Sequence, residues 1–183
     1  MNNQTYLTEE NTITTKFTIA TPENITMMHA LTKAIAREKF SALLPENVLE
    51  RYISDNFNEH ELKDEMNSMS NLWLTAYSGT EPAGYARITS KGKRPESLGD
   101  KRFIRLADYG ILNKFNDTAT RQSLFNKCLS ACQSYEGIWL NEYAENPLLA
   151  FFENNDFIRR QDTNNNFELP LPSVYLVRDH INL

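Results

Sequence analysis

The chain has 183 residues, of which 24 are acidic, 19 are basic and 40% are hydrophobic. This length allows one sizeable core and is too short to favour two, so we expect a polar N-terminal tail, residues 1–15, and a single domain, residues 16–183. The tail lacks the basic start and apolar core of a signal peptide, and no stretch approaches the roughly 20 apolar residues of a membrane span. We therefore expect a cytoplasmic protein that has no membrane partner.

The net charge of −5 is concentrated in residues 45–66, which hold seven acidic and two basic side chains. Removing this segment from the 24 acids and 19 bases leaves seventeen of each. No basic stripe remains that would neutralise a nucleic-acid backbone, so nucleic acid is not an expected partner. An acidic segment would attract a cationic substrate to a nearby cleft. The alternative is an ordinary solvated helix face.

The first predicted elements are a strand at Lys16–Ala20 and a helix that follows it directly. Thr21 suits the N-cap of this helix and Pro22 its first turn, and apolar residues recur at helical spacing as far as Phe40. A second helical segment is predicted over residues 45–66, where apolar side chains again fall on one face. The acidic segment is therefore expected to be helical.

Strands and helices alternate in the rest of the chain. Two antiparallel strands are predicted around a turn at Ser78 and Gly79, and a fourth strand beside them at residues 102–112. Helical periodicity returns at Thr118. The remaining predicted elements are a strand at 137–141, a short helix and a strand within 146–160, and a strand at 173–179 that closes the sheet.

This order of elements, together with three short stretches, resembles the GNAT acetyltransferase superfamily over roughly residues 16–180. The stretches are "EPAGYARI", with a glycine followed by an aromatic residue, "IWLNEYAEN", which ends at Asn146, and "FFENNDF", which is similar to the family's closing "FYEKLGF". Residues 40–70 and the hairpin after them are most similar to bacterial spermidine/spermine acetyltransferases. The resemblance implies an α/β (α+β) GNAT fold, in which a central mixed, mostly antiparallel sheet of about seven strands has helices on both faces.

The resemblance also implies an activity. The expected reaction moves an acetyl group from acetyl-CoA to a primary amine of a small, polyamine-like molecule, which attacks the thioester directly. Acetyl-CoA is then the cofactor and a small-molecule amine is the partner. The alternative is a catalytically inactive GNAT-fold protein that serves as a binding or regulatory module. A homodimer is left open beside a monomer.

The family's pyrophosphate loop, Gln/Arg-x-x-Gly-x-Gly/Ala, falls on residues 116–121, and both of its glycine positions are changed. In the family, these glycines let backbone N–H groups approach the diphosphate, and the helix N-terminus adds partial positive charge. By resemblance, the cofactor-binding residues of this loop are Asn116, Thr118, Ala119, Thr120 and Arg121. Arg121 would either fill the phosphate space or pair with a phosphate oxygen. We expect obstruction and weak acetyl-CoA binding, and the alternative is that Thr118 only caps an ordinary helix.

The resemblance places the pantetheine arm of the cofactor along the end of the fourth strand, on backbone groups of Ile111, Leu112 and Asn113. Asn146 and Phe152 complete the implied cofactor-binding set. Phe152 stands where the family usually has a tyrosine that protonates the departing thiolate, and phenylalanine has no proton to give. Another residue must therefore supply the acid.

Glu142, Tyr143 and Asp108 are the expected catalytic residues. Glu142 and Tyr143 fall where the fourth and fifth strands separate in the family, and a carboxylate to accept the amine's proton with a phenol to donate one would suffice. Asp108 follows Ala107, the position where many members carry a base-assisting glutamate. Strand alternation points Ala107 and Asp108 to opposite faces unless a bulge intervenes. The alternative for Glu142 and Tyr143 is an exposed pair at a strand end.

Metal and thiol chemistry are not expected. His29, His60 and His180 are scattered through the sequence, and no two have the spacing of metal ligands. Cys128 and Cys132 lie four residues apart in a helical pattern, which suits two small core residues better than a disulfide framework.

Overall fold

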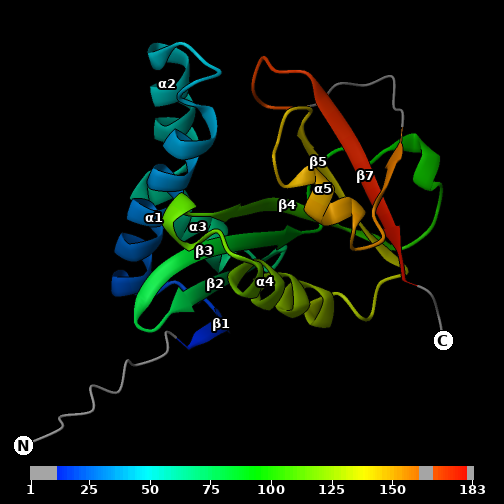
Figure 1. The fold of residues 1–183 in the computed structure, drawn as a ribbon, viewed down its shortest axis with the longest axis horizontal. Coiled ribbons are helices and arrows are strands. Elements are labelled where there is room, and N and C mark those ends of the chain that lie inside the picture. Colours follow the sequence, from blue (N-terminus) through cyan, green and yellow to red (C-terminus); the bar gives the residue numbers. More distant parts are fainter. Residues whose placement is uncertain (1–11, 161–166, 181–183) are drawn as a thin grey trace, which may run out of the picture.

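One mixed sheet organises the protein (Figure 1). The computed structural model describes residues 12–160 and 167–180, and within them seven strands pair in the order β1-β2-β3-β4-β5-β7-β6. The strands are β1 (Ile13–Phe17), β2 (Asn71–Ser78), β3 (Glu81–Thr89), β4 (Phe103–Ile111), β5 (Gly137–Tyr143), β6 (Ile158–Arg160) and β7 (Ser173–Asp179). Every neighbouring pair is antiparallel except β4 and β5, which run parallel. The predicted mixed, mostly antiparallel sheet is confirmed.

Helices cover both faces of the sheet, as expected. One face packs against α1 (Pro22–Phe40), α2 (Glu46–Asn56) and α3 (Glu59–Asn67), and the other against α4 (Thr118–Ala131) and α5 (Leu149–Glu153). Alternate residues of β2 and β3 enter the two cores, with Trp73 facing α1–α3 and Leu74 facing α4. Short 3₁₀ turns, η1 (Glu96–Leu98) and η2 (Asn113–Phe115), precede β4 and α4. No described helix is both long and apolar enough to cross a bilayer.

The outer strands differ from the prediction. β1 begins at Ile13 rather than Lys16, and the chain leaves the sheet after the Thr18 N–H bonds the carbonyl of Trp73 at 2.9 Å. At this edge the β-branched threonines before Lys16 pair with β2 although they do not alternate in polarity. At the other edge, the strand predicted to close the sheet, β7, lies between β5 and the three-residue β6.

The predicted helical segment over residues 45–66 is two helices. Asn58 accepts a hydrogen bond from the backbone N–H of Glu61 at 3.0 Å and caps α3, while the chain turns at Phe57, whose ring is buried. The apolar spacing does not reveal this break, because Leu62 and Met66 continue it on the same side. The break folds α3 back along α1 and β2.

Two irregularities of β4 shape the region where the site lies. Arg87 of β3 is opposite Asp108 and Ile88 is opposite Leu106, so Ala107 is the extra residue of a β-bulge. In addition, β4 pairs with β5 only from Phe103 to Arg105, after which the two strands separate, as Figure 1 shows. Because both changes occur near the middle of the sheet, side chains and backbone groups there are left without strand neighbours.

Candidate functional site

A groove of about 70 Å³ lies where β4 and β5 separate. We call it the β4–β5 groove; its walls are Glu38, Lys39, Gly110, Ile111, Asn113, Asn116, Tyr143, Asn146, Pro147 and Leu148. Five residues predicted for the site therefore meet here, namely Ile111, Asn113, Asn116, Tyr143 and Asn146. Gly110 is needed at this point, because a Cβ there would lie 2.4 Å from Ile35 of α1.

Two further hollows adjoin each other on the α1–α3 face. The inner cavity, about 40 Å³, lies between α1, α2 and β3–β5, and its walls include Lys39, Tyr52, Arg87, Arg105, Asn141 and Glu142. The outer cleft, about 290 Å³, opens beside α2 and α3, and its walls include Asp55, Glu61, Glu65, Lys91, Arg105 and Glu168. Asp108 borders both hollows. Lys39 lines both the inner cavity and the groove, so these two hollows adjoin at this side chain.

Glu142 lines the inner cavity and is only 6% exposed. Its carboxylate accepts hydrogen bonds from Lys39 Nζ at 3.2 and 3.4 Å and from Asn146 Nδ2 at 2.8 Å. The Asn146 side chain is fixed in turn, because its Oδ1 accepts the backbone N–H of Leu148 at 2.8 Å. Glu142 is therefore a buried, oriented carboxylate rather than the exposed strand-end residue of the alternative interpretation.

Lys39 was not identified from the sequence. It lies 103 residues from Glu142, in the last turn of α1, where a basic residue normally complements the helix dipole. Nothing in the helical pattern distinguishes it from Arg37, which pairs with Glu50 on the exposed side. Its ammonium also lies 5.7 Å from the ring centre of Tyr143.

Tyr143 is 4% exposed and forms part of the groove wall. Its ring packs against Phe40, with ring centres 5.3 Å apart. Burial, together with the negative charges of Glu142 and Glu145, raises the pKa of Tyr143 to about 12. The phenol thus keeps its proton at neutral pH and is able to donate it.

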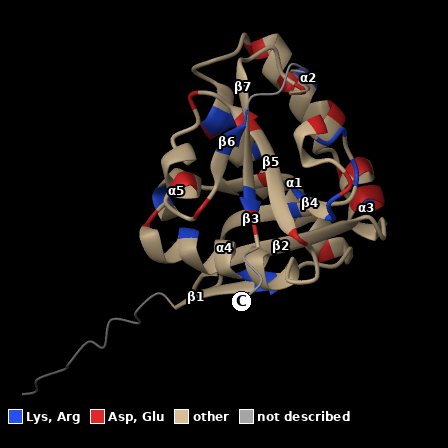
Figure 2. Ribbon diagram, turned by 90° about the vertical axis from the view of Figure 1, so that its right-hand side faces the viewer, with Lys and Arg blue, Asp and Glu red and all other residues tan. Residues whose placement is uncertain are grey.

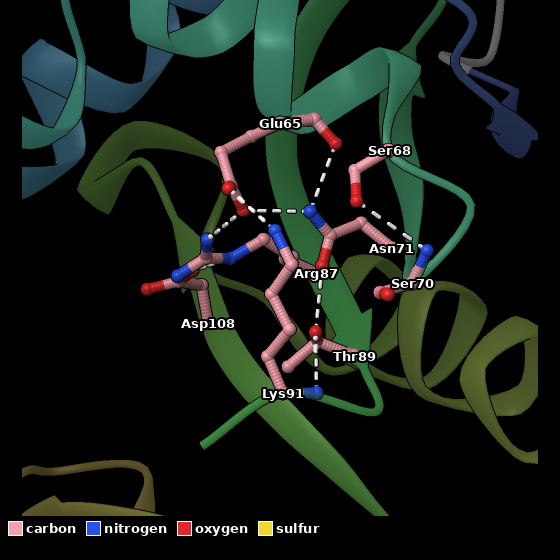
Figure 3. Close-up of polar contacts among 8 residues, drawn as sticks. All are labelled: Glu65, Ser68, Ser70, Asn71, Arg87, Thr89, Lys91 and Asp108. Atoms are coloured by element: carbon pink, nitrogen blue, oxygen red, sulfur yellow. Dashed lines mark hydrogen bonds and ion pairs between the residues drawn. The ribbon is translucent and has the colours of Figure 1, made fainter.

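Asp108 reaches the inner cavity because of the bulge, which brings it to the same cavity wall as Ala107. It does not stand free there. Arg87 Nε donates to Asp108 Oδ2 at 2.6 Å, and Arg87 Nη1 donates to Glu65 at 3.0 Å (Figure 3). Burial alone would lower the pKa of Arg87, but the charge and hydrogen bond of Asp108 raise it. Asp108 is consequently the partner of a permanent cation, as Glu142 is the partner of Lys39.

Glu65 extends this network to the edge of the outer cleft. Its carboxylate receives hydrogen bonds from Lys91 Nζ at 2.8 Å and from Asn71 Nδ2 at 2.6 Å (Figure 3). Partial burial would raise the pKa of Glu65, but these two hydrogen bonds and the charge of Arg87 lower it. The network holds α3 against β2 and β3, so that the acidic residues of α2 and α3 border the cleft (Figure 2).

The loop at residues 116–121 keeps part of an anion site and fills the rest itself. Asp117, not Thr118, is the N-cap of α4, and its carboxylate accepts the backbone N–H of Thr120 at 2.8 Å. The backbone N–H groups of Thr118 and Ala119 have no acceptor in the described structure. Two backbone N–H groups therefore remain available to bind an anion, while a third already donates to a carboxylate.

The Arg121 side chain lies back over this first turn of α4. Its Nη1 is 3.4 Å from Asn116 Oδ1, and its Nη2 is 3.5 Å from Thr118 Oγ1. These contacts are long for hydrogen bonds to a cation. The side chain thus covers the loop, and weak contacts hold it there.

The end of β4 offers fewer free backbone groups than predicted. The Leu112 N–H bonds the carbonyl of Ala83 at 2.9 Å, and the Asn113 N–H bonds Glu38 Oε2 at 2.7 Å. Phe152 lies outside the groove: its ring is fully buried within an aromatic cluster with Tyr109. Glu38, like Lys39, belongs to α1 and was missed because the sequence gives no sign that α1 approaches β4.

The remaining candidates take no part in the site. Cys128 of α4 and Cys132, the C-cap of this helix, are buried core residues that form no disulfide. Over residues 12–160 and 167–180, no group of three His, Cys, Asp or Glu side chains is arranged to hold a metal ion.

No family model matches the sequence. Solved structures do match the fold. The PaiA N-acetyltransferase of Thermoplasma acidophilum, solved with coenzyme A, aligns with a TM-score of 0.74 and 11% identity over 92% of this chain and 99% of that one. An acetyltransferase of Thermus thermophilus aligns at 0.64 and 15% over 91% and 97%, and a GNAT-family acetyltransferase of Staphylococcus aureus at 0.66 and 13% over 92% and 99%. The chain has the GNAT acetyltransferase fold.

Proposed function

We propose that the protein is an N-acetyltransferase that moves the acetyl group of acetyl-CoA to a primary amine of a small, cationic, polyamine-like acceptor. The observation that carries this proposal is the position of Glu142. Its buried carboxylate lines the inner cavity and is hydrogen-bonded to Lys39 and Asn146 of the groove wall, so a thioester in the groove and an amine in the cavity would meet near it. The PaiA enzyme of the same fold was solved with coenzyme A, which supports acetyl-CoA as the donor.

Two side chains would serve the reaction. Glu142 accepts the proton that the acceptor ammonium must lose before its nitrogen attacks, and Lys39 and Asn146 keep the carboxylate oriented. Tyr143, which holds its proton because its pKa is about 12, donates a hydrogen bond to the departing thiolate from the groove wall. Holding the amine against the thioester supplies much of the remaining rate.

The residues present fit acetyl-CoA in part. The free N–H groups of Thr118 and Ala119 at the N-terminus of α4 suit a diphosphate, and the Arg121 guanidinium lies beside them. Against binding, the carboxylates of Asp117 and Glu38 already accept two backbone N–H groups of this region. Weak binding of acetyl-CoA follows, because the ligand must either displace these carboxylates from the N–H groups or bind without using those groups.

The acceptor side suits a cation. Among the carboxylates of the outer cleft, those of Asp55, Glu61 and Glu168 have no cationic partner in the described part of the chain. Unpaired carboxylates at the mouth of a cleft raise the local concentration of cations and lower that of anions. This favours an acceptor with more than one amine.

The test is release of free thiol from acetyl-CoA by the full chain at low salt, with spermidine or hexylamine as acceptor. We expect thiol release with both and faster turnover with spermidine, since steering by the acidic cleft is strongest at low salt. Equal rates would remove the polyamine part of the proposal. Absence of thiol release with any amine would reject acetyl transfer.

A second candidate function has its own support. A catalytically inactive GNAT-fold module would not need acetyl-CoA. Carboxylates of the protein already accept the N–H groups of Asn113 and Thr120, which are part of the site expected to bind acetyl-CoA. Calorimetry separates the candidates: saturable acetyl-CoA binding favours the enzyme, and no binding up to millimolar concentration favours the inactive module.

A further inference from the structure

The inner cavity contains a guanidinium with no counter-ion. Arg105 borders both the inner cavity and the outer cleft, yet no carboxylate pairs with it in the described structure, and its buried Nε has no acceptor. Arg87, its neighbour in the same cavity, has two carboxylate partners. A buried N–H group without an acceptor destabilises the protein, and an anion that accepts its hydrogen bond removes this unfavourable free energy.

The Arg105 guanidinium is held in one orientation. It lies 5.3 Å from the ring centre of Trp139, the residue opposite Arg105 in the parallel β4–β5 pairing. A Cβ at Gly92 would lie 2.5 Å from Arg105 Nη1, so the loop after β3 also packs closely against the guanidinium. An oriented guanidinium is suited to a planar carboxylate, which it binds through two parallel hydrogen bonds.

A second unsatisfied group lies nearby on the same face of β5. Asn141, two residues beyond Trp139, is 4% exposed and borders the inner cavity, and its Oδ1 has no hydrogen-bond donor. Because alternate residues of a strand share a face, Asn141 follows on the same face of β5, with its Cα roughly 7 Å along the strand from that of the residue that stacks on Arg105. This oxygen requires a donor, and an ammonium group is the donor that an amine substrate provides.

We propose that the acceptor is a basic amino acid: Arg105 binds its carboxylate, Asn141 Oδ1 accepts a hydrogen bond from one of its ammonium groups, and the acidic outer cleft receives the other. The inference deepens the proposed function by replacing its polyamine-like acceptor with an amino acid, and it rests on that function only for the role of the bound molecule as acetyl acceptor. A polyamine would occupy the acidic cleft equally well but would leave Arg105 unpaired. The carboxylate therefore distinguishes the two classes of substrate.

The experiment compares two probes that differ only in that carboxylate, the amino acid lysine and 1,5-diaminopentane. Calorimetric titration into the full chain at fixed ionic strength needs neither acetyl-CoA nor turnover. We expect the wild type to bind lysine about tenfold more tightly than 1,5-diaminopentane, as one buried charge-assisted pair implies. Equal affinity, tighter binding of 1,5-diaminopentane, or no lysine binding at millimolar concentration would overturn the proposal.

Variants then assign the effect to Arg105. We expect Arg105→Gln to abolish the preference for lysine while 1,5-diaminopentane binds as before. Lys93→Gln, which removes one positive charge from the exposed loop outside both hollows, should keep the preference. A lysine preference that survives Arg105→Gln in the folded variant would overturn the assignment. If Arg105→Gln does not fold, the ratio of the wild-type affinities for lysine and 1,5-diaminopentane still tests the proposal. Arg105→Lys, which keeps the positive charge but lacks the planar guanidinium, should then reduce this ratio.

Failure of this inference is distinguishable from failure of the proposed function. Lysine binding without thiol release from acetyl-CoA would reject acetyl transfer and retain the amino-acid site. Thiol release with a preference for 1,5-diaminopentane would retain acetyl transfer and reject the amino-acid site.

Discussion

The two sides of the site differ in how far the chain's own carboxylates occupy them. On the acetyl-CoA side, Glu38 binds the N–H of Asn113 and Asp117 binds that of Thr120, although the Arg121 Nε there is buried without a partner in the described structure. In the inner cavity, Arg105 Nε and Asn141 Oδ1 are also buried without a partner, and no described carboxylate pairs with Arg105. Acetyl-CoA must therefore compete with carboxylates of the protein, whereas a ligand of Arg105 need not.

The difference shows that a shared fold does not determine how ready each half of a site is. A polar group that already has a hydrogen bond within the protein adds little to the free energy of ligand binding, because one hydrogen bond replaces another. A buried polar group without a hydrogen bond adds more when the ligand supplies one. We therefore expect substitutions in the groove to tighten donor binding and substitutions in the cavity to weaken acceptor binding.

The largest effect is expected at Glu142, which lines the inner cavity. Glu142→Gln should lower kcat by roughly 10²-fold or more, since general base catalysis contributes about that much. Glu23→Gln is the matched control, because Glu23 is exposed and lies outside the groove and cavity walls. Steady-state thiol release measures both variants. A Glu142→Gln enzyme as fast as Glu23→Gln would remove Glu142 from the mechanism.

The next effect concerns the unfolding free energy of the protein at alkaline pH, to which the buried Tyr143 contributes. Tyr143 has a pKa of about 12 in the folded protein against 10.0 for an ordinary tyrosine, so its contribution is complete below pH 10 and is lost as the pH rises toward 12. Between pH 8 and pH 11.5, wild type should lose about 2 kcal/mol more unfolding free energy than Tyr143→Phe. Urea unfolding at the two pH values measures the difference. Parallel losses would mean that Tyr143 is not buried as described.

A smaller effect, on the affinity for acetyl-CoA, is expected from removing the Glu38 carboxylate that accepts the Asn113 N–H. Glu38→Ala should tighten acetyl-CoA binding about fivefold by freeing one backbone donor, the value of an ordinary hydrogen bond. Glu23→Ala removes an exposed acid from the first turn of the same helix and should change nothing. If the two variants bind acetyl-CoA equally, the Glu38 contact does not compete with the donor.

The smallest effect is expected at Arg121, whose contacts to Asn116 and Thr118 are long. Arg121→Gly should tighten acetyl-CoA binding about two- to threefold by uncovering the loop, at a cost of about 1 kcal/mol in helix stability. Arg121→Ala separates removal of the side chain from the backbone effect of glycine. Weaker binding in both variants would mean that the guanidinium pairs with the diphosphate instead of covering its site.

The sequence predicted those parts of the site that are local along the chain. The family resemblance pointed to Glu142 and Asn146 at the end of a predicted strand and to the loop at 116–121 at the start of a predicted helix. Lys39 and Glu38 could not be predicted, since their roles depend on how closely α1 approaches β4 and β5, which no local pattern encodes. The bulge at Ala107 and the missing partner of Arg105 depend likewise on pairing between distant strands.

The most direct test is a calorimetric titration of acetyl-CoA into wild type and Asp117→Asn under one salt condition. Asparagine still caps α4 but carries no charge, so the change removes an anion from the diphosphate site without opening the helix. We predict weak, saturable binding to wild type and roughly tenfold tighter binding to Asp117→Asn, on the order of 1–2 kcal/mol for one partly exposed charge. Absence of binding to both proteins, or equal and tight binding to both, would contradict a donor groove that holds acetyl-CoA against its own carboxylates.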